Sequence, residues 1–172
     1  MRFRGTCYRA HDPKWSFKPT SGEGAAVHGG RFNPKGVQAL YLGLTVGCAI
    51  KEASQGFAFK IDPCILCCYD VDCTDIADLR KDAGRARHGV DLADMGCPWA
   101  ADLTDGRDPS SWAIARSLMS EGWAGILVPS FVVGATPEDQ VLVLWDWSAA
   151  PPHLVRVFDP GGRLPKNQLS WE

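Results

Sequence analysis

The 172 residues include 45% hydrophobic side chains and seven tryptophans, enough apolar mass for one compact domain, so we expect residues 1–172 to form a single domain. Lys and Arg number 18 against 20 Asp and Glu, and the net charge of -2 gives no broad positive field for nucleic acid or an anionic membrane. Direct nucleic-acid and membrane partners are therefore not expected, and an anionic ligand needs a local site.

The N-terminus and the cysteines indicate a cytoplasmic protein. The first residues lack an apolar stretch followed by a small-residue cleavage site, and no run approaches the roughly 20 apolar residues of a membrane helix. The seven cysteines are odd in number and scattered through the chain, which is typical of reduced thiols rather than of a disulfide framework.

The predicted elements mix strands and helices without a regular βαβ rhythm. In chain order they are a strand over about 3–10, an ordered loop to about 36, a strand over 37–43, a helix over about 46–55 capped by Thr45, a strand over 65–72, a short helix over 74–84 capped by Thr74 or Asp75, an amphipathic helix over 108–123, and strands over 124–131, 140–147 and 153–159. This order favours an α+β fold over a doubly wound sheet.

Arg31 is the first candidate for a binding residue. It lies in "GEGAAVHGGRFNPKG", between two adjacent glycines and an Asn-Pro-Lys-Gly turn. A guanidinium beside such a turn can bind a phosphate through two parallel hydrogen bonds. The alternative is an ordinary surface arginine of a hairpin, because the segment matches neither the Walker nor the dinucleotide-binding pattern.

Glu52 is a candidate carboxylate on the predicted helix over 46–55. Helical periodicity places it on one side with small residues, namely Thr45, Cys48 and Ala49. It therefore faces either a cleft or the solvated edge of the helix, where its neighbour Lys51 is expected in solvent.

Tyr41 and Ser130 are weaker candidates taken alone. Tyr41 lies in a predicted strand, and taken alone it is better explained as a core aromatic residue with a satisfied hydroxyl. Ser130 follows the apolar run "GILVP" and either donates a hydrogen bond into a pocket or simply ends the strand. It lacks the Gly-x-Ser-x-Gly pattern of an esterase nucleophile.

The cysteine-rich run "CILCCYDVDC" raises the question of a zinc site. It has no glycine turn between its first cysteines and no second Cys-x-x-Cys pair, so we expect a strand and no metal. The tryptophans are expected in the core or on a partner surface.

The sequence resembles the RES-domain family through four segments: "YRA", "GGRFNPKG", "ALYLG" followed by "AIKEA", and "GILVPSF". The resemblance covers about residues 3–147. It implies an ADP-ribosyltransferase-like fold, with two antiparallel sheets around an NAD cleft and flanking helices. It also implies the toxin of a type II toxin-antitoxin pair, which cleaves the nicotinamide-ribose bond of NAD without a metal. An Xre-like DNA-binding antitoxin would block the cleft.

The same resemblance implies a role for each matched residue. Glu52 would stabilise positive charge on the ribose, Tyr41 would stack on the nicotinamide, and Ser130 would hydrogen-bond the nicotinamide or its ribose. Arg31 and Arg9 would hold the pyrophosphate. The sequence has Phe32 where many relatives have tryptophan. Where many have an asparagine before the "LVLW" strand, Gln140 is the nearest amide, and we leave it out of the predicted site.

Two other classes of function stay open at this stage. One is a catalytically silent module that binds a nucleotide or a protein in the same cleft. The other is a zinc-dependent nucleic-acid module built on the cysteines, which the acidic balance disfavours. For the toxin, the sequence does not choose among water, phosphate and a protein as acceptor of ADP-ribose.

Overall fold

The computed structural model describes residues 1–55 and 61–169. Its strands are β1 (Phe3–His11), β2 (Leu40–Gly43), β3 (Ile65–Cys73), β4 (Ile76–Asp78), β5 (Gly125–Pro129), β6 (Gln140–Leu144) and β7 (His153–Val157). Its helices are the 3₁₀ turn η1 (Pro13–Trp15), α1 (Glu23–His28), α2 (Val46–Ala53), α3 (Asp82–Arg87), α4 (Leu92–Met95), α5 (Trp99–Thr104) and α6 (Ser110–Ser120).

The strands form one hydrogen-bonded sheet in the order β4-β5-β6-β2-β1-β3-β7. Only β4 and β5 run parallel among these neighbours. β1 pairs with β3 along its whole length, but it meets β2 at a single residue pair, Tyr8 with Gly43. The sheet therefore has two halves, β4-β5-β6-β2 and β1-β3-β7, that are joined at one point.

The mixed α+β class is confirmed, and the two expected antiparallel sheets correspond to these two halves. They differ from the expectation in being linked into one sheet and in having a parallel edge pair. The link lies where β2 runs directly against α2. The two elements are so close that a Cβ atom on Gly43 would stand 2.7 Å from the backbone nitrogen of Ala49. Only glycine fits this contact.

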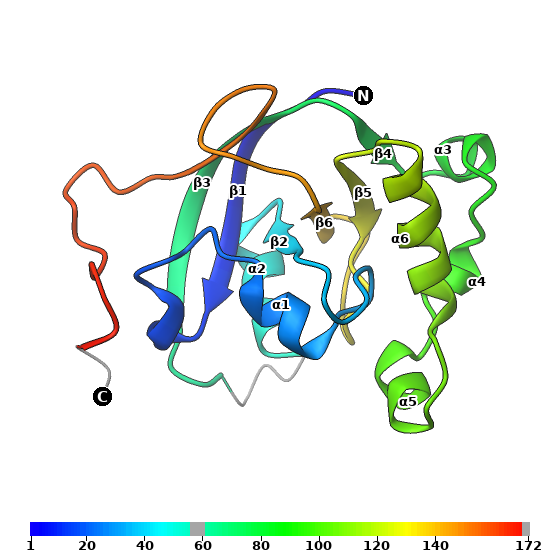
Figure 1. The fold of residues 1–172 in the computed structure, drawn as a ribbon, viewed down its shortest axis with the longest axis horizontal. Helices are drawn as coiled ribbons and strands as arrows, with labels where there is room; N and C mark the ends of the chain where they lie inside the picture. The colour runs from blue at the N-terminus through cyan, green and yellow to red at the C-terminus, as the bar shows by residue number, and fades with distance from the viewer. Residues whose placement is uncertain (56–60, 170–172) are drawn as a thin grey trace.

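The core forms two clusters because alternate residues of the central strands point to opposite faces. On β6, Leu142 and Leu144 belong to one cluster, whereas Val141 and Val143 belong to the other. The second cluster includes buried residues of α2, α4 and α6, so these helices cover that face. Figure 1 shows α3 to α6 gathered beside β4 and β5, with α1 and α2 nearer to β1 and β2.

The helix expected over 74–84 is wrong in its first half. Ile76–Asp78 forms β4, which pairs with β5 and buries Ile76 and Ala77, and α3 begins only at Asp82. Thr74 does not cap a helix, since its hydroxyl donates to the Asp75 carboxylate. Tertiary strand pairing has outweighed local capping chemistry here.

The other elements lie close to their expected ranges. Thr45 caps α2 as predicted, its hydroxyl accepting a hydrogen bond from the Cys48 N–H, although α2 ends at Ala53 rather than near Gln55. The loop before residue 36 contains η1 and α1, which were not predicted. The predicted buried side of α6 is confirmed for Trp112, Ala115 and Leu118, whereas Met119 is half-buried.

The helices are short. The longest, α6, has 11 residues, and no helix in residues 1–55 and 61–169 is long and apolar enough to cross a membrane.

Candidate active site

A cavity of about 370 Å³ opens where the two halves of the sheet meet, and Tyr8 and Gly43 both line it. This volume lies in the usual range for small-molecule sites. Its other lining residues include Arg9 from β1, Arg31 from the turn after α1, Tyr41 from β2 and Glu52 from α2. Ser130 lies between Pro129 and Phe131, which line the same cavity. Four of the five predicted site residues thus line one cavity, and Ser130 is hydrogen-bonded to one of them, Glu52.

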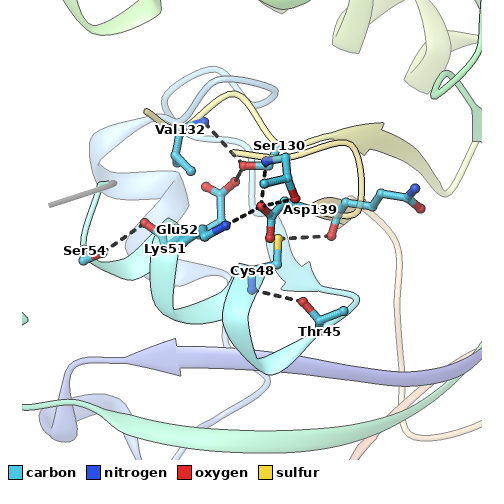
Figure 2. A network of polar contacts seen from close by, with 10 residues as sticks. Thr45, Cys48, Lys51, Glu52, Ser54, Ser130, Val132 and Asp139 are labelled. Carbon is cyan, nitrogen blue, oxygen red and sulfur yellow. Dashed lines mark hydrogen bonds and ion pairs between the residues drawn. The ribbon is translucent and has the colours of Figure 1, made fainter. Parts of the chain in front are cut away.

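Glu52 lies at the cavity wall, one turn after the buried Cys48 of α2. Its Oε1 atom accepts a hydrogen bond of 2.7 Å from the Ser130 hydroxyl, as Figure 2 shows. Burial raises the pKa of Glu52, while the Ser130 hydrogen bond and the positive charge of Arg31 oppose this shift. The cavity position predicted for Glu52 is therefore favoured over the solvated helix edge.

Lys51 is only partly in solvent, with 37% of its side chain exposed, because it is also paired with an acid. Its ammonium group lies 2.6 Å from the Asp139 carboxylate, whose side chain is only 7% exposed. The two residues are 88 positions apart in the sequence, so no local pattern could have predicted this pair.

The backbone around Arg31 is held by side chains from distant elements. The carbonyl groups of three consecutive residues each accept one side-chain hydrogen bond. The donors are Trp112 Nε1 to Gly30, Ser111 Oγ to Arg31 and Trp145 Nε1 to Phe32. Because α6 and the segment after β6 both fix this turn, Arg31 starts from a rigid backbone.

Tyr41 completes the anchoring of the same turn. Its hydroxyl accepts a hydrogen bond of 3.0 Å from the Phe32 N–H and donates one of 2.7 Å to Asn33 Oδ1. Burial raises the pKa of Tyr41, so the phenol stays neutral. A Cβ atom on Gly30 would lie 2.7 Å from this hydroxyl, which explains the glycine. The ring of Tyr41 remains available to the cavity.

The Arg31 guanidinium is partly engaged by the protein. Its Nη1 atom donates to the carbonyls of Met95 and Cys97, at 3.1 Å and 2.7 Å. Its Cζ atom lies 4.9 Å from the centre of the Phe131 ring, a cation-π distance. No hydrogen bond within residues 1–55 and 61–169 engages its Nε or Nη2. Burial lowers the pKa of Arg31, but an arginine remains charged. Part of this cation is therefore available to an anion.

Arg9 has a structural task as well. Its Nη1 atom donates to the carbonyls of Pro19 and Ser21, at 3.1 Å and 3.0 Å, and the Tyr69 hydroxyl also donates to Pro19. Arg9 thus holds the loop between η1 and α1 beside the cavity.

Three residues that the sequence analysis did not place in the site lie in or beside it. Phe131 and Trp99 line the cavity, and Asp139 supports it through Lys51. Their signals in the sequence were weak: Phe131 is an aromatic residue next to Ser130, Trp99 is one tryptophan among seven, and Asp139 is an acid next to Gln140. Gln140 itself accepts a hydrogen bond from Arg80 and does not line the cavity.

The cysteine-rich segment forms β3 as expected. Cys67 and Cys73 point into the core, whereas Cys68 lies on the opposite face. Within the described parts of the chain, no group of three or more His, Cys, Asp and Glu side chains is arranged to hold a metal ion.

Comparison with known families identifies the family of the chain. A family model described as the RES domain matches residues 6–167. The chain belongs to the RES domain family. The resemblance seen in the sequence is thereby confirmed. A search of curated proteins finds no significant match.

One solved structure is similar to this RES domain over most of its length. A chain in the crystal structure of the M. tuberculosis MbcT–MbcA toxin-antitoxin complex superposes with a TM-score of 0.60 and 23% sequence identity. The similarity covers 92% of this RES domain and 84% of that chain. At this identity, the comparison establishes the fold.

Within this RES domain, the Arg, Glu and Ser of the predicted site come from three separate elements. Arg31 precedes β2, Glu52 is on α2, and Ser130 follows β5. The Glu–Ser pair is in direct hydrogen-bond contact, and Arg31 is near enough to Glu52 to oppose the rise in its pKa. The site is therefore an anchored carboxylate with a nearby, partly available guanidinium.

Proposed function

We propose that this RES domain is the toxin of a bacterial type II toxin-antitoxin pair and that it consumes NAD. In this proposal NAD binds in the cavity at the junction of the sheet halves, its nicotinamide-ribose bond is cleaved, and ADP-ribose passes to an acceptor. The observation that carries the proposal is the half-buried Glu52 carboxylate, held by Ser130 in the wall of a cavity that Arg9 and Arg31 also line.

The carboxylate suits this reaction because positive charge develops on the ribose as nicotinamide leaves. A carboxylate fixed beside that carbon lowers the energy of the transition state without reorganising. Glu52 must be ionised for this, and the Ser130 hydrogen bond together with Arg31 favours the ionised form against the effect of burial. Since the Ser130 proton is already donated to Glu52, we assign Ser130 to orienting the carboxylate.

The two arginines suit the pyrophosphate. Each uses one terminal nitrogen for main-chain carbonyls and leaves other N–H groups unpaired within residues 1–55 and 61–169. A guanidinium fixed in this way presents its remaining donors in a set direction to a phosphate. We assign the ring of Tyr41, whose hydroxyl is used in the turn, to contact with the nicotinamide.

The partner in this proposal is an Xre-like DNA-binding antitoxin that blocks the cavity. The structural similarity to a chain of a toxin-antitoxin complex supports an antitoxin as the partner. We further propose that residues 1–172 act as one domain, that the reaction takes place in the cytoplasm and arrests growth, and that no metal takes part.

Release of nicotinamide from NAD by the purified protein tests the catalytic proposal. We expect Glu52→Gln to lower kcat by about 100- to 1000-fold, the usual effect of removing one electrostatic group from an active site. Glu121→Gln is the matched control, because Glu121 is exposed and lies outside the cavity. Equal activity in wild type and Glu52→Gln would remove Glu52 from catalysis.

The second candidate, a silent binding module, predicts NAD binding without turnover and growth inhibition that Glu52→Gln does not affect. Mass spectrometry of the products formed with phosphate and with cell lysate then identifies the acceptor. Free ADP-ribose indicates water, ADP-ribose 1″-phosphate indicates phosphate, and a modified polypeptide indicates a protein target.

A further inference from the structure

Two adjacent residues of α2 are connected to opposite ends of one loop, residues 130–139, which joins β5 to β6. Glu52 accepts the hydrogen bond from Ser130 at the start of the loop, and Lys51 pairs with Asp139 at its end, at 2.7 Å and 2.6 Å. The loop closes on itself, because the Ser130 N–H donates to the Asp139 carbonyl at 2.8 Å. These contacts form a closed ring, and Figure 2 shows its two side-chain contacts, Glu52 with Ser130 and Lys51 with Asp139.

Asp139 is the residue of this ring that makes further hydrogen bonds to the loop. Besides Lys51, its carboxylate accepts hydrogen bonds from the Thr136 N–H and hydroxyl, at 2.8 Å and 3.1 Å. The Lys51 hydrogen bond is the main reason that the pKa of Asp139 lies below its ordinary value. A buried carboxylate without its cation would be strongly unfavourable, so Lys51 and Asp139 hold each other in place.

The loop also contacts the second charged group of the site. Phe131 packs against the Arg31 guanidinium, directly after Ser130. Val132 and Val133 line the cavity, and Val133 is 79% exposed at its mouth. The base of the loop is thus fixed by polar contacts, and its next residues reach Glu52, Arg31 and the opening of the cavity.

We propose that Lys51 and Asp139 are positioning residues, which hold the 130–139 loop against α2 and thereby fix the Ser130 hydroxyl on Glu52. The inference rests on the proposed function in assigning Glu52 to catalysis, but the contact itself can be tested without turnover. Neither residue lines the cavity, so both act through Ser130.

The charge on Glu52 reports this contact. The titratable and charged groups near it are Arg31, Tyr41, Cys48 and Asp139, together with the Lys51 ammonium group that is paired with Asp139. Ser130 lowers the pKa of Glu52 more than Asp139 raises it. Loss of both effects should therefore raise the pKa of Glu52, whereas loss of the Asp139 charge alone should lower it.

A matched pair of variants separates these cases. Asp139→Ala removes the charge and every side-chain acceptor, so we expect the Ser130 contact to fail and the pKa of Glu52 to rise, as in Ser130→Ala. Asp139→Asn removes the charge but keeps an acceptor for Thr136 and Lys51, so the pKa should fall. Asp108→Asn is the control, since Asp108 pairs with Arg116 on an exposed surface.

Carbon-13 NMR of the glutamate carboxyl groups measures this pKa in the free protein. The sequence has glutamates only at 23, 52, 121, 138 and 172, so Glu52 is assigned by its absence in Glu52→Gln. A pKa that falls or stays constant in Asp139→Ala would overturn the proposal. Wild-type protein that does not release nicotinamide would overturn the proposed function and leave this measurement intact.

Two further measurements cover activity and a variant that does not fold. In the active protein, kcat for nicotinamide release should fall about 10- to 100-fold in Asp139→Ala and largely recover in Asp139→Asn, with KM for NAD nearly constant.

If Asp139→Ala does not fold, Lys51→Met takes its place. Amide hydrogen exchange at Ser130 and Thr136 should then accelerate about tenfold or more, while α6 is unaffected. Unchanged exchange at both amides would refute the positioning role.

Discussion

Replacement of Tyr41 by phenylalanine separates the two tasks of this residue. The variant keeps the ring at the cavity and removes only the hydroxyl. That hydroxyl accepts from the Phe32 N–H and donates to Asn33 Oδ1, at 3.0 Å and 2.7 Å. Phe32 and Asn33 are 2% and 0% exposed, so water does not readily replace the lost partner.

The expected magnitude follows from these two contacts. A buried polar group left without a partner costs about 1–3 kcal/mol, so two such groups lower the free energy of unfolding by about 2–6 kcal/mol. For a protein of this size, the melting temperature should fall by at least about 4 °C. Because the turn that carries Arg31 loosens, KM for NAD should also rise.

Urea unfolding and nicotinamide release measure the two effects. Tyr8→Phe is the matched control, since Tyr8 lines the same cavity and its hydroxyl has no hydrogen-bond partner in residues 1–55 and 61–169. We expect that control to stay within about 0.5 kcal/mol of wild type. If Tyr41→Phe unfolds like Tyr8→Phe, the hydroxyl does not hold the turn and the reasoning is refuted.

Three further predictions follow from the same site. Gly30→Ala should lower the free energy of unfolding by about 1–3 kcal/mol, because its Cβ would lie 2.6 Å from Asn33 Oδ1. Gly24→Ala is the control and should lose no stability, because a Cβ there would have nothing within 4 Å. Equal losses in the two variants would contradict this prediction. Burial raises the pKa of Glu52 above its unfolded value, so Glu52→Gln should be more stable than wild type at neutral pH and lose that advantage as pH falls below the raised pKa. A Glu52→Gln variant that is less stable than wild type at neutral pH would contradict this prediction. Ser130→Ala should move the acid limb of the kcat/KM profile to higher pH, and an unmoved limb would separate Ser130 from the ionisation of Glu52.

Much of the secondary structure was predictable because it depends on neighbouring residues. β5 and β6 are buried on both faces, and their continuous runs of apolar residues predict such strands directly. Thr45 marks the start of α2 because a cap acts within one turn. The short β4 could not be predicted from its neighbouring residues, since it becomes a strand only by pairing with β5, which lies far along the chain.

The sequence alone also indicated the family and predicted part of the candidate site, because Arg31, Tyr41, Glu52 and Ser130 stand in recognisable segments. Only the tertiary structure decided what each side chain touches. The Tyr41 hydroxyl is used inside the turn, one nitrogen of Arg31 is bound to carbonyls near α4, and Lys51 meets Asp139 across 88 positions of sequence. Local patterns encode periodicity and capping over a few residues, whereas these contacts depend on strand order and register, which bring distant segments together.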